Sequence, residues 1–102
     1  MRMDWLGPWC EVESDAVAES LRAELVREVP VGHVLHGVVG VRAIGYRKDR
    51  DDVAFALADG RVAVVHLTWG RTEAVWPDPS TEVLESVEAF GRRVEEDHRD
   101  WG

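Results

Sequence analysis

The chain has 102 residues, 45% of them apolar, and a formal net charge of −8, which fits one domain spanning residues 1–102. The negative charge argues against nucleic acid as the main partner, because phosphate binding needs a basic face. No segment approaches the ~20 apolar residues of a membrane helix, so no membrane partner is expected. The single Cys10 cannot form an internal disulfide, and we therefore expect a cytoplasmic location.

The first helix is expected to begin at Ser14 or Asp15, because either side chain can accept a hydrogen bond from the first helical turn. Pro30 ends it, since the residue before a proline is displaced from the helical region. Apolar residues spaced by three and four predict the buried stripe. That stripe consists of Val17, Leu21, Leu25, Val26 and Val29, and the charged residues, Glu24 among them, are expected to fall largely outside it.

Two histidines, His33 and His36, stand three residues apart in a segment bracketed by glycines. Two imidazoles on an extended loop can bind one metal ion, but a closed site needs about four ligands. The remaining ligands would have to come from Glu11, Glu13 or His98, and no HExxH motif or cysteine pair supports such a site. We interpret His33 and His36 as loop histidines with ordinary hydrogen bonds, and we predict no metal and no cofactor.

Branched apolar residues predict an antiparallel meander of three strands over residues 38–47, 52–58 and 61–69. Asp59-Gly60 is typical of a two-residue hairpin loop between the last two strands. In that register Phe55 faces Val64 and Val53 faces His66 on one side of the sheet. Both sides would then be apolar. Because two helices can leave part of the sheet uncovered, a homodimer through an uncovered sheet face is one expected assembly.

His66 interrupts an otherwise apolar strand. A buried imidazole must be hydrogen-bonded, and Asp51 is its diagonal neighbour in the predicted register. His66 with Asp51 could form the base and the orienting acid of a catalytic site, but no nucleophile stands in a recognisable context. We therefore favour a structural histidine enclosed by valines over a catalytic one.

Five tryptophans are many for a chain of this length, and two of them, Trp69 and Trp76, flank a loop broken by two prolines. Tryptophan and arginine are enriched where proteins bind one another, because they combine large contact areas with hydrogen-bond donors. The predicted binding residues are accordingly Trp69, Arg71 and Trp76. The alternative for each tryptophan is that it closes one edge of a small core.

The C-terminal segment has two interpretations. Ser80 can begin one long helix, or residues 81–85 can form a short fourth strand that is followed by a helix over residues 87–97, with Ser86 as its cap. We favour the second interpretation, because the tighter helical pattern starts at Ser86. The predicted fold class is therefore α+β, with an N-terminal helix, a three-stranded antiparallel meander that a short fourth strand can extend, and a C-terminal helix.

The valine-rich strand that ends in His66-Leu67-Thr68-Trp69 resembles a strand in a family of small uncharacterised bacterial proteins. The resemblance extends from about residue 30 to residue 98 and includes Trp76-Pro77 and the segment Ser86–Phe90. It implies a bacterial cytoplasmic origin and a helix that starts at Ser86. It implies no mechanism, because no activity is established for that family.

Two functions from different classes follow as hypotheses. The first is a non-enzymatic protein-binding or accessory module, of an inhibitory or immunity-like kind, whose partner is another protein or a second copy of the chain. The alternative is a small hydrolase-like or metal-dependent enzyme, centred on His66 with Asp51 or on His33 with His36. A polar pocket at His66 beside a carboxylate would favour the enzyme.

Overall fold

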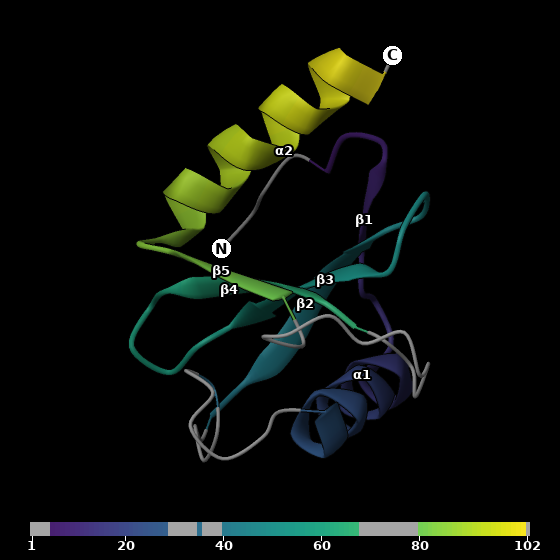
Figure 1. The fold of residues 1–102 in the computed structure, drawn as a ribbon, viewed down its shortest axis with the longest axis vertical. Helices are drawn as coiled ribbons and strands as arrows, with labels where there is room; N and C mark the ends of the chain where they lie inside the picture. Colours follow the sequence, from purple (N-terminus) through teal and green to yellow (C-terminus); the bar gives the residue numbers. More distant parts are fainter. Residues whose placement is uncertain (1–4, 29–34, 36–39, 68–79, 102) are drawn as a thin grey trace.

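A computed structural model describes residues 5–28, 35, 40–67 and 80–101 (Figure 1). The described chain forms one antiparallel sheet with the strand order β1-β2-β3-β4-β5, together with two helices. In chain order the elements are β1 (Trp9–Glu11), α1 (Asp15–Glu28), β2 (Arg42–Arg47), β3 (Asp52–Ala56), β4 (Val62–His66), β5 (Ser80–Leu84) and α2 (Val87–Trp101).

The predicted α+β class is confirmed, but the predicted number of strands is wrong. The sheet has five strands, because β5 exists and because β1 adds to the edge of β2. β1 has three residues, too few for an alternating pattern to stand out in the sequence. The preferred interpretation of the C-terminal segment is confirmed, since a short strand precedes a helix that begins after Ser86. The Ser86 hydroxyl accepts a hydrogen bond from the backbone N–H of Ala89 at 3.1 Å.

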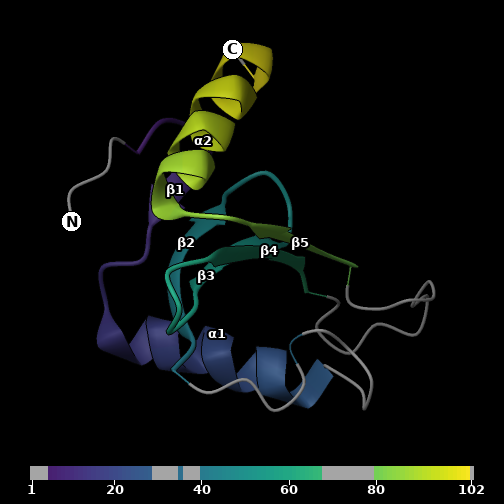
Figure 2. The same cartoon turned by 90° about the vertical axis from the view of Figure 1, so that its left-hand side faces the viewer.

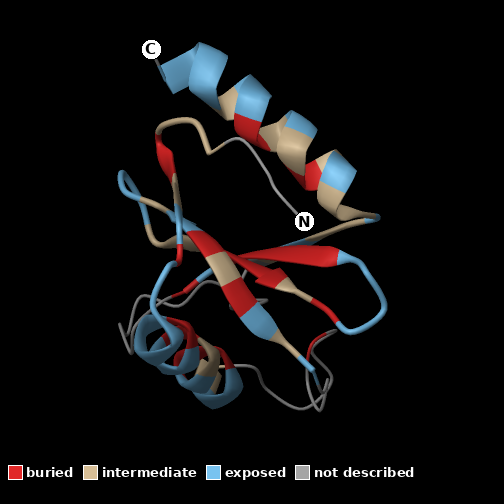
Figure 3. Cartoon of the chain, turned by 180° about the vertical axis from the view of Figure 1, so that it is seen from behind, coloured by how far each residue is buried: buried red, intermediate tan, exposed pale blue. Residues whose placement is uncertain are grey.

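The two helices lie on opposite faces of the sheet (Figures 1 and 2). Phe55 belongs to the cluster of buried residues that contains the packing face of α1, whereas Phe90 and Val94 of α2 belong to a second cluster. In the burial colouring, the middle of the sheet is buried and the outer surfaces of both helices are exposed (Figure 3). In the described part of the chain one helix therefore lies against each face of the sheet, and the expected homodimer stays a prediction.

The register of the β3–β4 hairpin differs by one residue from the predicted register. Asp52 pairs with His66 and Phe55 with Ala63. The backbone N–H of Leu57 donates to the carbonyl oxygen of Arg61 at 2.9 Å, so the loop has three residues, 58–60, and not two. Gly60 has a φ of 95°, as in the three-residue loops that end in a glycine bulge.

This one-residue shift decides which side chains share a face, because successive side chains of a strand point to opposite faces. Phe55 shares its cluster with Ala63 and Val65 on the α1 side, whereas Ala54 shares its cluster with Val62 and Val64 on the α2 side. The predicted pairing of Phe55 with Val64 is therefore wrong. A large residue on one strand lies beside a small one on the next, which fills each face without excess volume.

The packing face of α1 is rotated relative to the predicted stripe. Ala18, Leu21 and Leu25 are buried, whereas Val17 and Val26 are 45% and 59% exposed. The spacing of residues 18, 21 and 25 is as helical as that of residues 17, 21 and 25, so the periodicity alone did not distinguish the two faces. Glu24, expected outside the stripe, is buried. Val29 lies outside the described residues.

Candidate functional site

The β2–β3 connection is a charged hairpin tip, which we define as residues 47–51. It begins with Arg47, the last residue of β2, and its sequence, Arg47-Lys48-Asp49-Arg50-Asp51, contains no apolar side chain. A hollow lies on each side of it, and Arg47 and Arg50 line both hollows. The tip and its two hollows form the candidate site.

The first hollow, on the α1 side, has a volume of about 430 Å³. Leu21 and Val53, both buried, lie within it, while Val17 and Tyr46 stay 45% and 37% exposed at the surface. The rest of its lining is charged and comes from the hairpin tip and the start of β3: Arg47, Lys48, Arg50, Asp51 and Asp52. It therefore combines an apolar surface with a charged wall.

The second hollow, on the α2 side, has a volume of about 370 Å³ and lies between the hairpin tip and the last turns of α2. Its lining is almost entirely charged: Arg47, Asp49, Arg50, Asp97 and Asp100, with Trp101 as the one aromatic ring. The ring is 45% exposed, and the ammonium group of Lys48 lies 4.8 Å from its centroid. Such a distance is within the range of a cation–π interaction.

Arg47 holds the hairpin tip in place. Its guanidinium donates two hydrogen bonds to Asp49, from Nε at 2.9 Å and from Nη2 at 2.8 Å, and its Nη1 lies 3.4 Å from Asp97 Oδ2 on α2. The same Asp97 oxygen accepts a hydrogen bond from Trp9 Nε1 of β1 at 2.8 Å. One cation therefore connects the hairpin to α2, and one carboxylate connects α2 to β1.

The pKa values in this network follow from the pairing. Burial lowers the pKa of Arg47, but the hydrogen bonds to Asp49 and the charges of Asp49, Asp97 and Asp52 outweigh it, so its pKa is raised. The hydrogen bonds from Arg47 lower the pKa of Asp49. Both partners thus remain charged, and the geometry of the tip is held by charge-assisted bonds, which are stronger than neutral ones.

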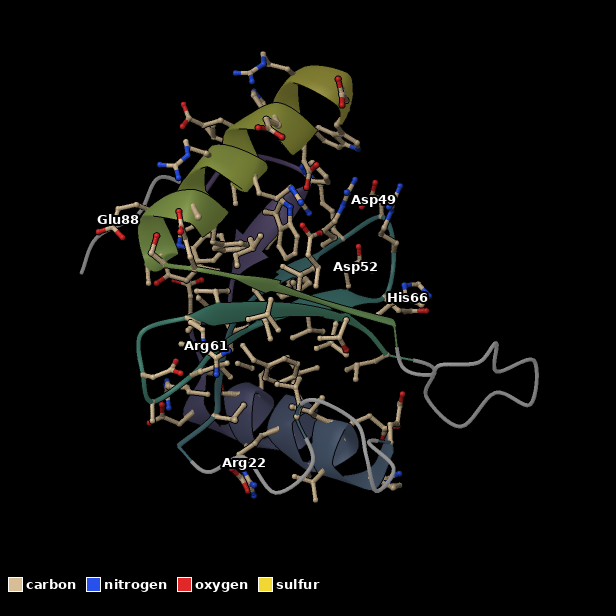
Figure 4. All side chains as sticks on the ribbon, turned by 60° about the vertical axis from the view of Figure 1, so that its left-hand side comes forward. Arg22, Asp49, Asp52, Arg61, His66 and Glu88 are labelled. Carbon is tan, nitrogen blue, oxygen red and sulfur yellow. The ribbon has the colours of Figure 1, made fainter. Side chains whose placement is uncertain are left out.

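His66 is placed differently from the prediction. Its side chain is 48% exposed at the end of β4 and is not enclosed by valines. Its Nδ1 lies 2.8 Å from Oδ1 of Asp52, whose side chain is 16% exposed, and the two lie side by side in Figure 4. The predicted partner, Asp51, lines the α1-side hollow instead. The one-residue change of register is the physical reason for the exchange of partners.

Five further residues that the sequence singled out lie outside the described chain. They are the expected binding residues Trp69, Arg71 and Trp76 and the candidate metal ligands His33 and His36. Among the residues that the structure does describe, no group of three or more His, Cys, Asp or Glu side chains could hold a metal ion. No helix in the same residues is long and apolar enough to cross a membrane.

Sequence reasoning did not single out Arg47 and Asp97. A signal for Asp97 was present, because it follows the buried Phe90 and Val94 at helical spacing and so lies on the packing side of α2. A carboxylate in such a place needs a partner. The identity of that partner was not readable, since Trp9 is 88 positions away in the sequence.

Comparisons with protein-family models, with curated proteins and with solved structures found no match to this chain. The resemblance to the bacterial family with the His-Leu-Thr-Trp strand therefore stays a prediction. The function has to be argued from the side chains themselves.

Proposed function

We propose that the protein is a non-enzymatic protein-binding or accessory module, of an inhibitory or immunity-like kind, that acts in the cytoplasm. The observation that supports this function is the charged hairpin tip between two hollows, one with an apolar surface and one with an exposed tryptophan. A partner that receives the tip between two of its own segments would contact both hollows at once.

The anchoring of the tip supports a binding role. Binding costs less free energy when the binding residues are already ordered, because fewer side chains lose freedom on association. The Arg47 side chain is 10% exposed, hydrogen-bonded to Asp49 on the tip and ion-paired with Asp97 on α2, so the tip is held before a partner arrives. The exposed Tyr46 and Trp101 are of the aromatic kind that contributes most at interfaces.

The net charge of the chain indicates the sign of the charge expected on the partner. A net charge of −8 attracts a protein of opposite charge over distances comparable to the Debye length, which raises the association rate. We therefore expect a basic protein partner whose association slows as salt is added. Trp69, Arg71 and Trp76 remain proposed binding residues. A Trp76→Ala bait in the experiment below tests them.

The binding proposal is tested with three baits, the wild-type protein and two substituted variants. The first is the wild-type protein, the second carries Val17→Ser and Tyr46→Ser in the α1-side hollow, and the third carries Val26→Ser. Val26 is also an exposed valine of α1 but does not line that hollow, so it controls for the loss of an apolar surface residue.

We expect a partner captured from the native cell by the wild-type and Val26→Ser baits to be lost with the double variant. With purified components, calorimetry should give an affinity for the double variant lower by about tenfold or more, which corresponds to about 1.4 kcal/mol. A Trp76→Ala bait tests the loop in the same way. Equal retention of the same proteins by all baits would contradict both proposed surfaces.

A second copy of the chain is the other proposed partner. Because a helix lies on each face of the sheet in the described part, we expect any self-association to use the hairpin tip and its hollows, not a bare sheet face. Light scattering on the wild-type protein and on the double variant measures this. A dimer that the double variant retains would place the contact elsewhere.

The alternative function, a small hydrolase-like enzyme centred on His66, is supported by one observation. The Nδ1 atom of the exposed His66 lies 2.8 Å from a carboxylate oxygen of Asp52, as in the base and orienting acid of many hydrolases. A metal-dependent version has less support, because the described residues contain no group of three potential ligands.

A further inference from the structure

The α2-side hollow lies where the hairpin tip approaches the end of α2. The last turns of this helix and the β2–β3 connection lie on the same side of the molecule, and residues of both line the hollow (Figure 1). Its volume of about 370 Å³ falls within the roughly 300–1,000 Å³ that small-ligand sites occupy. The hollow therefore has room for one large side chain of a partner.

The carboxylate oxygens that line this hollow are only partly used by the chain itself. Asp49 accepts hydrogen bonds from Arg47 at both of its oxygens. Asp97 uses one oxygen, Oδ2, for Trp9 and Arg47, and its Oδ1 accepts no hydrogen bond from a described residue. The exposed Asp100 forms no hydrogen bond or ion pair with any residue that the structure describes. One whole carboxylate and one further oxygen are therefore available as acceptors.

The electrostatic surroundings of the hollow favour a cation. Two arginines and three aspartates line it, so the formal charge of the lining is −1. The last turn of α2 ends at the hollow, and the C-terminal end of a helix carries a partial negative charge. One of the two arginines, Arg50, is paired with Asp52, 3.9 Å away, which lines the opposite hollow. An added positive charge is therefore stabilised at the α2-side hollow.

The ring of Trp101 already attracts a cation from within the chain. It is 45% exposed, and the ammonium group of Lys48, the only lysine of the chain, lies 4.8 Å from its centroid. A guanidinium group is planar and less strongly hydrated than an ammonium group. It stacks on aromatic rings and forms two parallel hydrogen bonds with one carboxylate. An arginine side chain is therefore a better occupant of this ring and its neighbouring carboxylates than a lysine.

We propose that the α2-side hollow binds an arginine side chain of the protein partner, with the guanidinium group over the Trp101 ring and against the carboxylates of Asp97 and Asp100. This inference rests on the proposed protein-binding function, and it names the chemistry of one contact that the basic partner makes beside the hairpin tip. Binding displaces the ammonium group of Lys48 from the ring. Lys48 is therefore an internal competitor of the partner.

The test titrates the intact protein with N-acetyl-arginine methylamide, which carries the guanidinium group without a partner protein. Heteronuclear NMR follows the indole N–H signals of the five tryptophans, and the signal missing from Trp101→Leu is that of Trp101. The lysine amide and the neutral citrulline amide are the control ligands. We expect the arginine amide to shift the Trp101 signal at concentrations about threefold or more below those of the lysine amide. The citrulline amide should leave this signal unchanged.

Paired variants separate the contacts in the hollow from the overall charge. Asp100→Asn should weaken binding of the arginine amide by about threefold or more, because the charge-assisted hydrogen bonds to the carboxylate are lost. Glu88→Gln makes the same change of charge at the start of α2, away from the hollow, and should bind like the wild type (Figure 4). Lys48→Met should strengthen binding, because it removes the internal competitor. Arg61→Met removes the same charge beyond the other end of β3 and should not strengthen it.

Three results of this titration would overturn the inference. The first is an equal response of the Trp101 signal to the three amides. The second is equal binding of the arginine amide by Asp100→Asn and Glu88→Gln. The third is a Lys48→Met variant that binds the arginine amide no better than Arg61→Met does. Circular dichroism checks that each variant is folded, which the exposure of all four substituted side chains makes expected.

The capture experiment distinguishes a failure of this inference from a failure of the proposed function. We expect an Asp100→Asn bait to lose the partner that the wild-type and Glu88→Gln baits retain. If the Asp100→Asn bait retains the partner and the bait with Val17→Ser and Tyr46→Ser loses it, protein binding is confirmed and the arginine site is wrong. Equal retention of the same proteins by every bait would contradict the proposed function, and with it the partner that this inference requires.

Discussion

At the scale of single residues, the buried Glu24 departs most from its surroundings. It is 3% exposed on the packing face of α1, beside Leu21 and Leu25. A hydrogen bond with Glu28, burial and the charge of Glu28 all raise its pKa, and Arg27, 3.0 Å away, only partly opposes them. Folding therefore favours the protonated form of this carboxyl group.

This raised pKa predicts a pH dependence of stability. Below the usual pKa of 4.5, Glu24 is protonated in the folded and the unfolded chain, and its full contribution to stability is present. As the pH rises through the higher folded-state pKa, the proton is lost and that contribution with it. Glu24→Gln keeps the shape without the titration, so its urea midpoint should rise relative to the wild type between pH 4 and 8.

Glu19→Gln is the control for this experiment, on the same helix. The hydrogen bond from Arg22 lowers the pKa of Glu19, so this carboxylate stabilises the fold when charged and the sign of its effect is opposite. Its variant should not gain stability as the pH rises. A midpoint difference for Glu24→Gln that stays constant over the whole pH range would mean that the carboxyl group titrates normally.

At the scale of elements, two glycines have room for a larger side chain. Substituting them therefore tests the backbone conformation without a change in packing. A Cβ atom added at Gly60 or at Gly91 would meet no atom within 4 Å. Gly60 ends the hairpin loop with a φ of 95°, which disfavours any other residue, whereas Gly91 lies inside α2, where glycine is a poor helix former.

The two alanine substitutions should therefore have opposite effects. Gly60→Ala is expected to lower the free energy of unfolding by about 1 kcal/mol, through strain in the left-handed region. Gly91→Ala is expected to raise it by about 1 kcal/mol, through helix propensity. Chemical denaturation of both variants measures this. If Gly60→Ala left the free energy of unfolding unchanged, residue 60 would not have a positive φ and the hairpin loop would differ from the one described.

At the scale of the whole molecule, both helices depend on the same sheet. β3 and β4 contribute Phe55 and Val65 to the α1-side cluster, and Ala54 and Val62 to the α2-side cluster. If β3 and β4 unfold, both clusters lose their sheet residues at the same time. Unfolding should for this reason be one cooperative transition, as in most domains of this size.

This prediction is checked with a substitution on each side, Leu25→Ala in α1 and Val94→Ala in α2, both at buried positions. Leu25→Ala should cost about 2–5 kcal/mol, and Val94→Ala about 2 kcal/mol, because both leave cavities. In each variant the circular dichroism and tryptophan fluorescence transitions should coincide. If Val94→Ala shifts fluorescence alone, α2 detaches as a separate unit.

The local elements were predictable because their signals are local. Ser86 accepts a hydrogen bond at the start of α2, α1 begins beside Ser14, and the Asp59-Gly60 turn stands between two strands, as the sequence indicated. Caps and turns depend on side chains within four residues of one another. Together they determined the α+β class, although β1 was too short to be recognised.

Contacts between distant residues were decided by the tertiary structure alone. A two-residue and a three-residue loop are both compatible with Asp-Gly. The observed register places Asp52, not Asp51, beside His66 and gives each helix its own set of buried sheet residues. In the same way, the sequence located α2 but not the bond between Trp9 and Asp97. Turns are determined by residues that are neighbours in the sequence. The pairing of strands and of distant side chains depends on which apolar surfaces meet when the chain folds.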